Sequence, residues 1–183
     1  MTISEKYTRM QSFARIDGAK LGLMWIVSFA LFTGYFKYPI CGTLWLLTMV
    51  FTPFYVAKLT YSYSENSPGK HISYSHAFAH SFFTVFYASL ILAISQWFYF
   101  QYIDHGYFIE NYSSILTDAN TTKQMEALGY SKEMITGIIE QLRSLRPIDI
   151  SLQILWGNIL AGMVMGISTA LFVSVRRYWS PRK

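Results

Sequence analysis

Long uncharged stretches, rich in apolar residues, alternate with short charged segments along the chain. Residues 21–36, 38–57, 71–103 and 150–175 contain no Asp, Glu, Lys or Arg. A helix needs about 20 predominantly apolar residues to cross the hydrocarbon core of a bilayer. The pattern therefore predicts four transmembrane helices, at about residues 16–36, 39–58, 75–102 and 148–175.

These spans predict an all-α membrane protein in which residues 1–183 form a single integral membrane domain. A soluble bundle is disfavoured because its helices would need a polar face, which these stretches mostly lack. A transmembrane barrel is disfavoured because its strands would show segments of about ten residues with alternating polarity. We expect residues 1–16 to form a polar lead-in, and Pro53 to kink the second span or end it early.

Residues 104–147 form the longest segment outside the predicted spans. Thr121 or Thr122 is a candidate cap for a short helix that ends at Leu128. A second, amphipathic helix should begin near Ser131, because apolar residues then recur on one face as far as Leu145. We therefore expect a small extracytoplasmic helical segment between the third and fourth spans.

Composition and charge support a membrane setting and an orientation. Hydrophobic residues make up 52% of the chain and charged residues 14%, whereas soluble domains average about 25% charged residues. The side with both termini carries ten basic and three acidic residues, and the other side five basic and seven acidic residues. Because basic residues concentrate on the cytoplasmic side, both termini should be cytoplasmic in a multi-pass inner (plasma) membrane protein. No nucleic-acid-binding motif accompanies the net charge of +5.

Three of the four histidines lie near the start of the third predicted span. His76 and His80 are four residues apart and would share one face of a helix, as zinc ligands do, with His71 as a third candidate ligand. A different interpretation places two of them in a polar stripe that faces other helices. The residues of this stripe are His76, His80, Thr84, Tyr87 and Ser95.

Small residues recur at one-turn intervals in the first and fourth predicted spans. Such spacing leaves a smooth groove that lets another helix approach closely. The groove could serve packing inside the bundle or docking of a partner protein. The residues assigned to these grooves are Gly18, Gly22, Gly162, Gly166 and Ala170, with Asn158 on the same face.

Motifs of catalysis and of ion coupling are missing from the sequence. No nucleophile elbow, phosphate-binding loop, dinucleotide fingerprint or metalloprotease helix is present. Asp17, Lys20, Asp104 and Asp149 lie at the ends of the predicted spans, and no ionisable residue is predicted near the bilayer midplane. Since ion-coupled transporters usually carry such residues, this pattern argues against proton-coupled transport.

The order of these features resembles a known family. A basic start leads through Asp17-Gly18-Ala-Lys-Leu-Gly22 into the first span, and Gly69 precedes the stretch Ile72-Ser-Tyr-Ser-His-Ala-Phe78. Over residues 13–178 the chain is similar to the domain-of-unknown-function 4199 family, small four-span membrane proteins common in Bacteroidota. The resemblance implies a bacterial inner-membrane setting and implies no activity.

Three functional hypotheses follow from the sequence. The first is a non-catalytic membrane subunit without a cofactor, which contacts the lipid bilayer and assembles with itself or with a membrane enzyme such as an envelope glycosyltransferase. The second is a small-molecule or lipid transporter that moves its substrate along the polar stripe. The third is a zinc-dependent membrane enzyme that uses the histidines.

Overall fold

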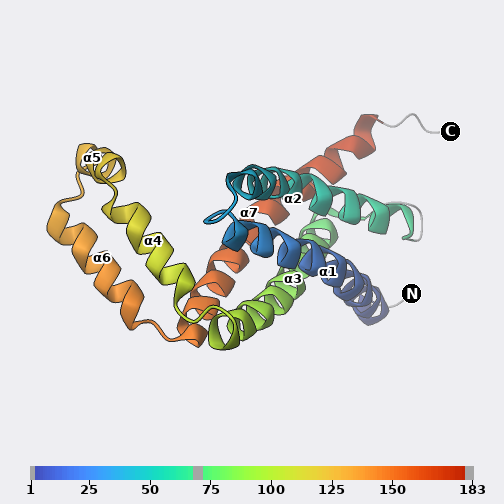
Figure 1. Cartoon of the computed structure of the whole chain (residues 1–183). Coiled ribbons are helices and arrows are strands. Elements are labelled where there is room, and N and C mark those ends of the chain that lie inside the picture. The colour runs from blue at the N-terminus through green and yellow to red at the C-terminus, as the bar shows by residue number, and fades with distance from the viewer. Residues whose placement is uncertain (1–2, 68–71, 180–183) are drawn as a thin grey trace. The chain divides into compact units, whose positions relative to one another are not determined.

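The computed structural model describes residues 3–67 and 72–179, which fold entirely into helices and their connections (Figure 1). The seven helices are α1 (Ile3–Gly34), α2 (Pro39–Glu65), α3 (Tyr74–Tyr102), α4 (Tyr107–Thr117), α5 (Ala119–Ala127), α6 (Lys132–Ser144) and α7 (Pro147–Trp179). Helices α1, α2, α3 and α7 are long and apolar enough to cross a membrane, with candidate spans of 27 to 30 residues. The predicted all-α fold with four spans is confirmed.

Two helix boundaries differ from the prediction. Helix α1 begins at Ile3 instead of near residue 16, and Met10 and Ala14 on its extension are completely buried. Helix α2 continues through Pro53 as far as Glu65, so the expectation of an early end was wrong. A proline removes a single backbone hydrogen bond, and the buried side chains that follow it, such as Val56 and Tyr63, hold the helix in place.

The chain divides into two compact units, residues 1–94 with 154–183 and residues 95–153. In the first unit, side chains of α1, α2 and α3 form a hydrophobic core around Leu21, Val56 and Val85. Trp25 belongs to this core, and its indole N–H donates a hydrogen bond of 3.2 Å to Thr52 Oγ1 on α2. The core thus joins α1, α2 and α3 through apolar contacts, and one buried hydrogen bond, from Trp25 to Thr52, links α1 with α2.

Small residues allow α7 and α1 to approach α3 closely. A Cβ atom added to Gly162 would lie 2.7 Å from Cγ1 of Val85, and one added to Gly18 would lie 2.6 Å from Cβ of Tyr87. Real Cβ atoms essentially never approach other heavy atoms this closely, so a side chain at either position would force a neighbouring group to move. Gly22, Gly166 and Ala170 also lie against other helices, and Asn158 is half-buried.

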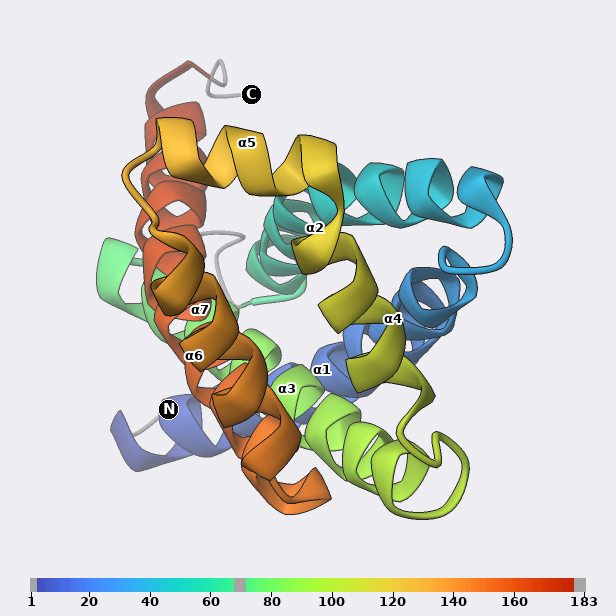
Figure 2. The same cartoon turned by 60° about the vertical axis from the view of Figure 1, so that its left-hand side comes forward.

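The second unit contains α4, α5 and α6, with α4 and α6 side by side (Figure 2). Its core consists of Leu116 from α4 and Ile135 and Ile139 from α6. Helix α6 begins beside Ser131 as predicted, and the Ser131 hydroxyl caps it by accepting a hydrogen bond from the Met134 N–H. A further hydrogen bond with Ser131 lowers the pKa of the Glu133 carboxyl below its ordinary value.

The sequence did not reveal α4, and it assigned the wrong cap to α5. Asp118 caps α5, in place of Thr121 or Thr122, by accepting hydrogen bonds from the N–H groups of Asn120 and Thr121. The Asp104 carboxylate accepts a bond of 3.0 Å from the Phe108 N–H in the first turn of α4. Gly106, with a φ of 88°, provides the left-handed turn that starts this helix.

The contact between α7 and α3 can be tested with a matched pair of substitutions. Gly162→Leu should lower the free energy of unfolding by about 1–3 kcal/mol, because the new side chain would overlap Val85. Gly157→Leu is the control, since a Cβ atom added to Gly157 on the same helix would meet no atom of another element within 4 Å. Thermal unfolding in detergent provides the measurement, and equal melting temperatures for the two variants would contradict this packing.

Candidate functional site

A cluster of buried polar side chains lies where α1, α2 and α3 meet. Asp17 comes from α1, Thr60 from α2, and His80 and Ser81 from α3. Asp17 is 6% exposed, and the other three side chains are completely buried. Since burying a polar group is costly unless it finds a partner, this cluster is the region of the described chain where a specific function is best supported.

The Asp17 carboxylate has one partner on its own helix and one on α3. Its Oδ1 atom lies 2.9 Å from the Lys20 ammonium, which is three residues farther along α1. Its Oδ2 atom lies 3.5 Å from Nε2 of His80. The Lys20 side chain is 54% exposed, so the ion pair connects the buried carboxylate with the surroundings of the bundle.

The His80 ring is fixed by two residues of α2. Its Nδ1 atom lies 3.1 Å from Thr60 Oγ1. The Tyr63 ring stacks on the imidazole with ring centroids 4.4 Å apart and planes 3° from parallel. These contacts leave Nε2 as the ring nitrogen that faces Asp17, where it has no hydrogen-bond partner among the described residues.

The number of available protons indicates which nitrogen of His80 carries a hydrogen. Ser81 donates its hydroxyl proton to the Ala77 carbonyl at 2.8 Å, because a carbonyl can only accept. Thr60 must then donate its own proton to Ser81, whose oxygen lies 2.9 Å away. Nδ1 of His80 is left to donate to Thr60. In the neutral ring, Nε2 is therefore an acceptor that faces another acceptor, Asp17 Oδ2.

The burial of this cluster follows from the extension of α1. Thr60 lies five residues before the end of α2, and His80 lies six residues after the start of α3, which corresponds to about 8–9 Å from each helix end. The N-terminal half of α1 covers the region, and Phe13 lies with its ring 5.4 Å from the Tyr63 ring. Asp17 consequently lies in the middle of α1, whereas the prediction placed it at the end of a span.

The predicted polar stripe on α3 has uneven surroundings. His80 and Thr84 are completely buried, whereas His76, Tyr87 and Ser95 are half-buried. The predicted stripe did not include Ser81, which belongs to the buried cluster. Ser81 was missed because it follows His80 directly, and helix periodicity alone gives no reason to include the next residue.

The histidines of the predicted zinc site have separate surroundings. His76 Nδ1 lies 3.0 Å from Ser73 Oγ, and its ring lies 5.1 Å from that of Tyr7. His71 lies outside the described residues. Within residues 3–67 and 72–179, no three His, Cys, Asp or Glu side chains are grouped closely enough to hold a metal ion. Zinc binding therefore stays a prediction that needs His71 or another ligand.

Removal of one hydroxyl group tests the cluster. Thr60→Val keeps the side-chain shape and removes the bonds to His80 and Ser81, so unfolding should become easier by about 1–2 kcal/mol. Thr136→Val is the control, because the Thr136 hydroxyl is exposed and bonds only to its own helix. Unfolding in micelles measures both variants. A Thr60→Val protein as stable as the control would show that the cluster does not hold the helices together.

Comparisons with known proteins place this architecture in a family. No curated protein and no solved structure matches the chain. A family model described as "Protein of unknown function (DUF4199)" matches residues 17–174, which include all four candidate spans apart from the start of α1. The match also covers Asp17, Thr60, His80 and Ser81. The chain is a multi-span membrane protein that belongs to the DUF4199 family.

Proposed function

We propose that this protein is a non-catalytic subunit of a bacterial inner-membrane assembly, in which α7 contacts a second copy or another membrane protein. The observation that carries the proposal is the contrast between a filled interior and an unpartnered outer face of α7. A filled interior offers no path for a substrate, and an apolar helix face is a surface on which another helix can pack.

The interior is filled where the helices cross. Val85 of α3 occupies the space that a side chain at Gly162 would need, and Tyr87 does the same for Gly18. Thr84, which a substrate moving along the polar stripe would have to pass, is completely buried. These contacts favour a packed bundle over an open transport path.

The outer face of α7 consists of large apolar side chains spaced by three or four residues. The most apolar window of this helix is 22% buried within the protein, compared with 17% for α2, 33% for α1 and 44% for α3. The side chains of this face are 48% to 66% exposed; they are Trp156, Leu160, Val164, Ile167 and Leu171. Lipid contacts such a face in the isolated protein, and van der Waals packing against a complementary helix can replace the lipid.

We also propose that both termini lie in the cytoplasm. The support is the charge balance of the sequence, with ten basic and three acidic residues on the side that carries the termini. Basic residues near span ends remain on the cytoplasmic side during membrane insertion. A reporter fused after Lys183 that is active only outside the cytoplasm would overturn this orientation.

Site-specific crosslinking tests the subunit proposal. A photo-crosslinking residue in place of Leu160, on the outer face of α7, should give one discrete adduct in native membranes. The same residue in place of Leu46, which is 56% exposed on α2, is the matched control. Adducts with lipid alone at Leu160, together with a purified protein that is strictly monomeric and has no partner, would contradict the proposal.

Transport is the second candidate, and the buried Asp17–His80 contact favours it. Carboxylate and imidazole groups inside membrane proteins form proton relays in pumps and transporters. Here two buried acceptors face each other at 3.5 Å, an arrangement that one added proton could bridge. Proton flux into vesicles reconstituted with this protein, abolished by Asp17→Asn, would favour transport over the subunit role. The zinc-dependent enzyme remains a prediction without added support.

A further inference from the structure

The buried contact between Asp17 and His80 lacks a hydrogen. Nε2 of His80 lies 3.5 Å from Asp17 Oδ2 and has no hydrogen-bond partner among the described residues. The His80 side chain is completely buried, and Asp17 is 6% exposed. In the neutral ring both facing atoms are acceptors, and a buried polar atom without a partner is costly. This contact between α1 and α3 is therefore a place where one added proton would be bound.

Protonation of Nε2 would satisfy both side chains without moving the rest of the cluster. The Nε2 lone pair takes a proton from water, and the resulting imidazolium has two N–H donors. The Nδ1–H group keeps its bond to Thr60 Oγ1 at 3.1 Å, while the new Nε2–H group faces Asp17 Oδ2. Charge-assisted N–H···O bonds span about 2.7–2.9 Å, so we expect this contact to shorten when the proton binds.

The neighbours of the His80 ring favour a positive charge. The Tyr63 ring stacks on the imidazole with centroids 4.4 Å apart, and the face of an aromatic ring attracts a cation. The Lys20 ammonium also pairs with Asp17, but it lies 2.9 Å from Oδ1 and is 54% exposed. The second carboxylate oxygen, Oδ2, is consequently the one that faces His80.

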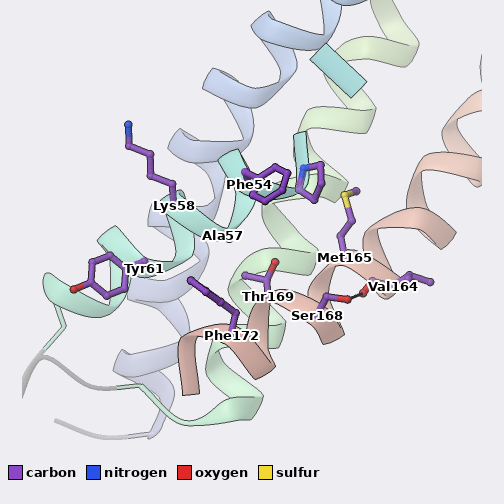
Figure 3. A pocket seen from close by; sticks show the side chains of 10 residues that line it. Phe54, Ala57, Lys58, Tyr61, Val164, Met165, Ser168, Thr169 and Phe172 are labelled. Carbon is purple, nitrogen blue, oxygen red and sulfur yellow. Dashed lines mark hydrogen bonds between the residues drawn. The ribbon is translucent and has the colours of Figure 1, made fainter. Parts of the chain in front are cut away.

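Helices α2 and α7 bring little further charge to this ring. The Tyr63 hydroxyl is titratable, but tyrosine ordinarily titrates near pH 10. Lys58 is exposed and lies two residues, or about 200° around the helix, from Thr60. Helix α7 lies across an open groove from α2 (Figure 3), and residues 150–175 contain no Asp, Glu, Lys, Arg or His.

The other charged or titratable side chains near the cluster on α1 and α3 have contacts of their own. The Arg9 guanidinium donates a hydrogen bond of 2.7 Å to the Asn66 carbonyl. His76 lies one turn before His80 on α3, and its Nδ1 atom is 3.0 Å from Ser73 Oγ. The carboxylate of Asp17 is thus the group that a proton on His80 Nε2 would meet.

We propose that Asp17 and His80 hold one proton between them, and that this bound proton fastens α1 to α3. The N-terminal half of α1 buries Met10 and Ala14 completely, so loss of the proton should loosen the segment that covers the cluster. This role is independent of the subunit function. It also differs from a transport relay, because the proton stays bound between the two helices.

Nitrogen-15 NMR of the full chain in bilayers tests the proposal, with EDTA present to remove zinc and the His80 signals assigned from a His80→Gln sample. At about pH 7, slightly above the pH at which an ordinary histidine is half-protonated, both ring nitrogens of His80 should carry protons. In Asp17→Asn, Nε2 should lose its proton, because the amide has no negative charge and can donate to the neutral ring.

Asp104→Asn is the matched control for this experiment. Asp104 is also 6% exposed, but its carboxylate accepts a bond from the Phe108 N–H at the start of α4. His80 should therefore keep both protons in Asp104→Asn. A neutral His80 ring in the unchanged protein at about pH 7, or the same protonation in Asp17→Asn as in the unchanged protein, would overturn the proposal.

The pH dependence of unfolding in detergent gives a second readout. The folded protein should hold this proton more tightly than the unfolded chain, so stability should fall as the pH rises and the proton leaves. Between about pH 6 and pH 8, the melting temperature should fall by about 3 °C more in the unchanged protein than in Asp17→Asn. The other three histidines are present in both proteins and cancel in this comparison. Equal pH dependence of the two proteins, or proton flux through reconstituted vesicles that Asp17→Asn abolishes, would contradict a fixed proton.

Discussion

The hydrogen bonds of Thr60 with His80 and Ser81 are the constraint on which the arrangement of α2 and α3 depends. A polar group in a low-dielectric interior must meet a partner, because water is not available to replace it. His80 Nδ1 and Ser81 Oγ lie 3.1 Å and 2.9 Å from Thr60 Oγ1, whereas His80 Nε2 lies 3.5 Å from Asp17 Oδ2 without a hydrogen bond. Rotation or sliding of α2 against α3 would separate Thr60 from His80 and Ser81 and leave these polar groups without their bonds between helices.

Close packing supports the same arrangement from the apolar side. Gly18 lies one residue after Asp17 on α1, and it lets α1 approach Tyr87 of α3 within a distance that excludes any side chain. The carboxylate and the glycine therefore act together, since the short distance between backbones brings Asp17 within reach of His80. On α7, Gly162 likewise allows the helix backbone to approach Val85 of α3 closely. Helix α3 thus contacts both α1 and α7 at glycines where a larger residue would force a neighbouring group to move.

The sequence predicts the four spans well because length and apolar composition are local properties. It fails at the start of α1, where charged residues such as Lys6 and Arg9 end the apolar run but do not end the helix. It also fails for the buried cluster. Asp17 and His80 are 63 positions apart, and only the folded arrangement shows that the extension of α1 shields both from water. The polar residues of α3 predicted a stripe along that helix. They did not predict that Thr60 of α2 would be the hydrogen-bond partner of His80.

The hydrogen-bond pattern around His80 is accessible to a direct measurement. Nitrogen-15 NMR of histidine-labelled protein in bilayers, with the His80 signals assigned from a His80→Gln sample, reports which ring nitrogens carry a proton. The arrangement of Ser81, Thr60 and His80 requires a proton on Nδ1. A protonated Nδ1 would support this chain of hydrogen bonds between α2 and α3. A proton on Nε2 alone would contradict it, because Thr60 could not then donate to Ser81 and to His80 at once.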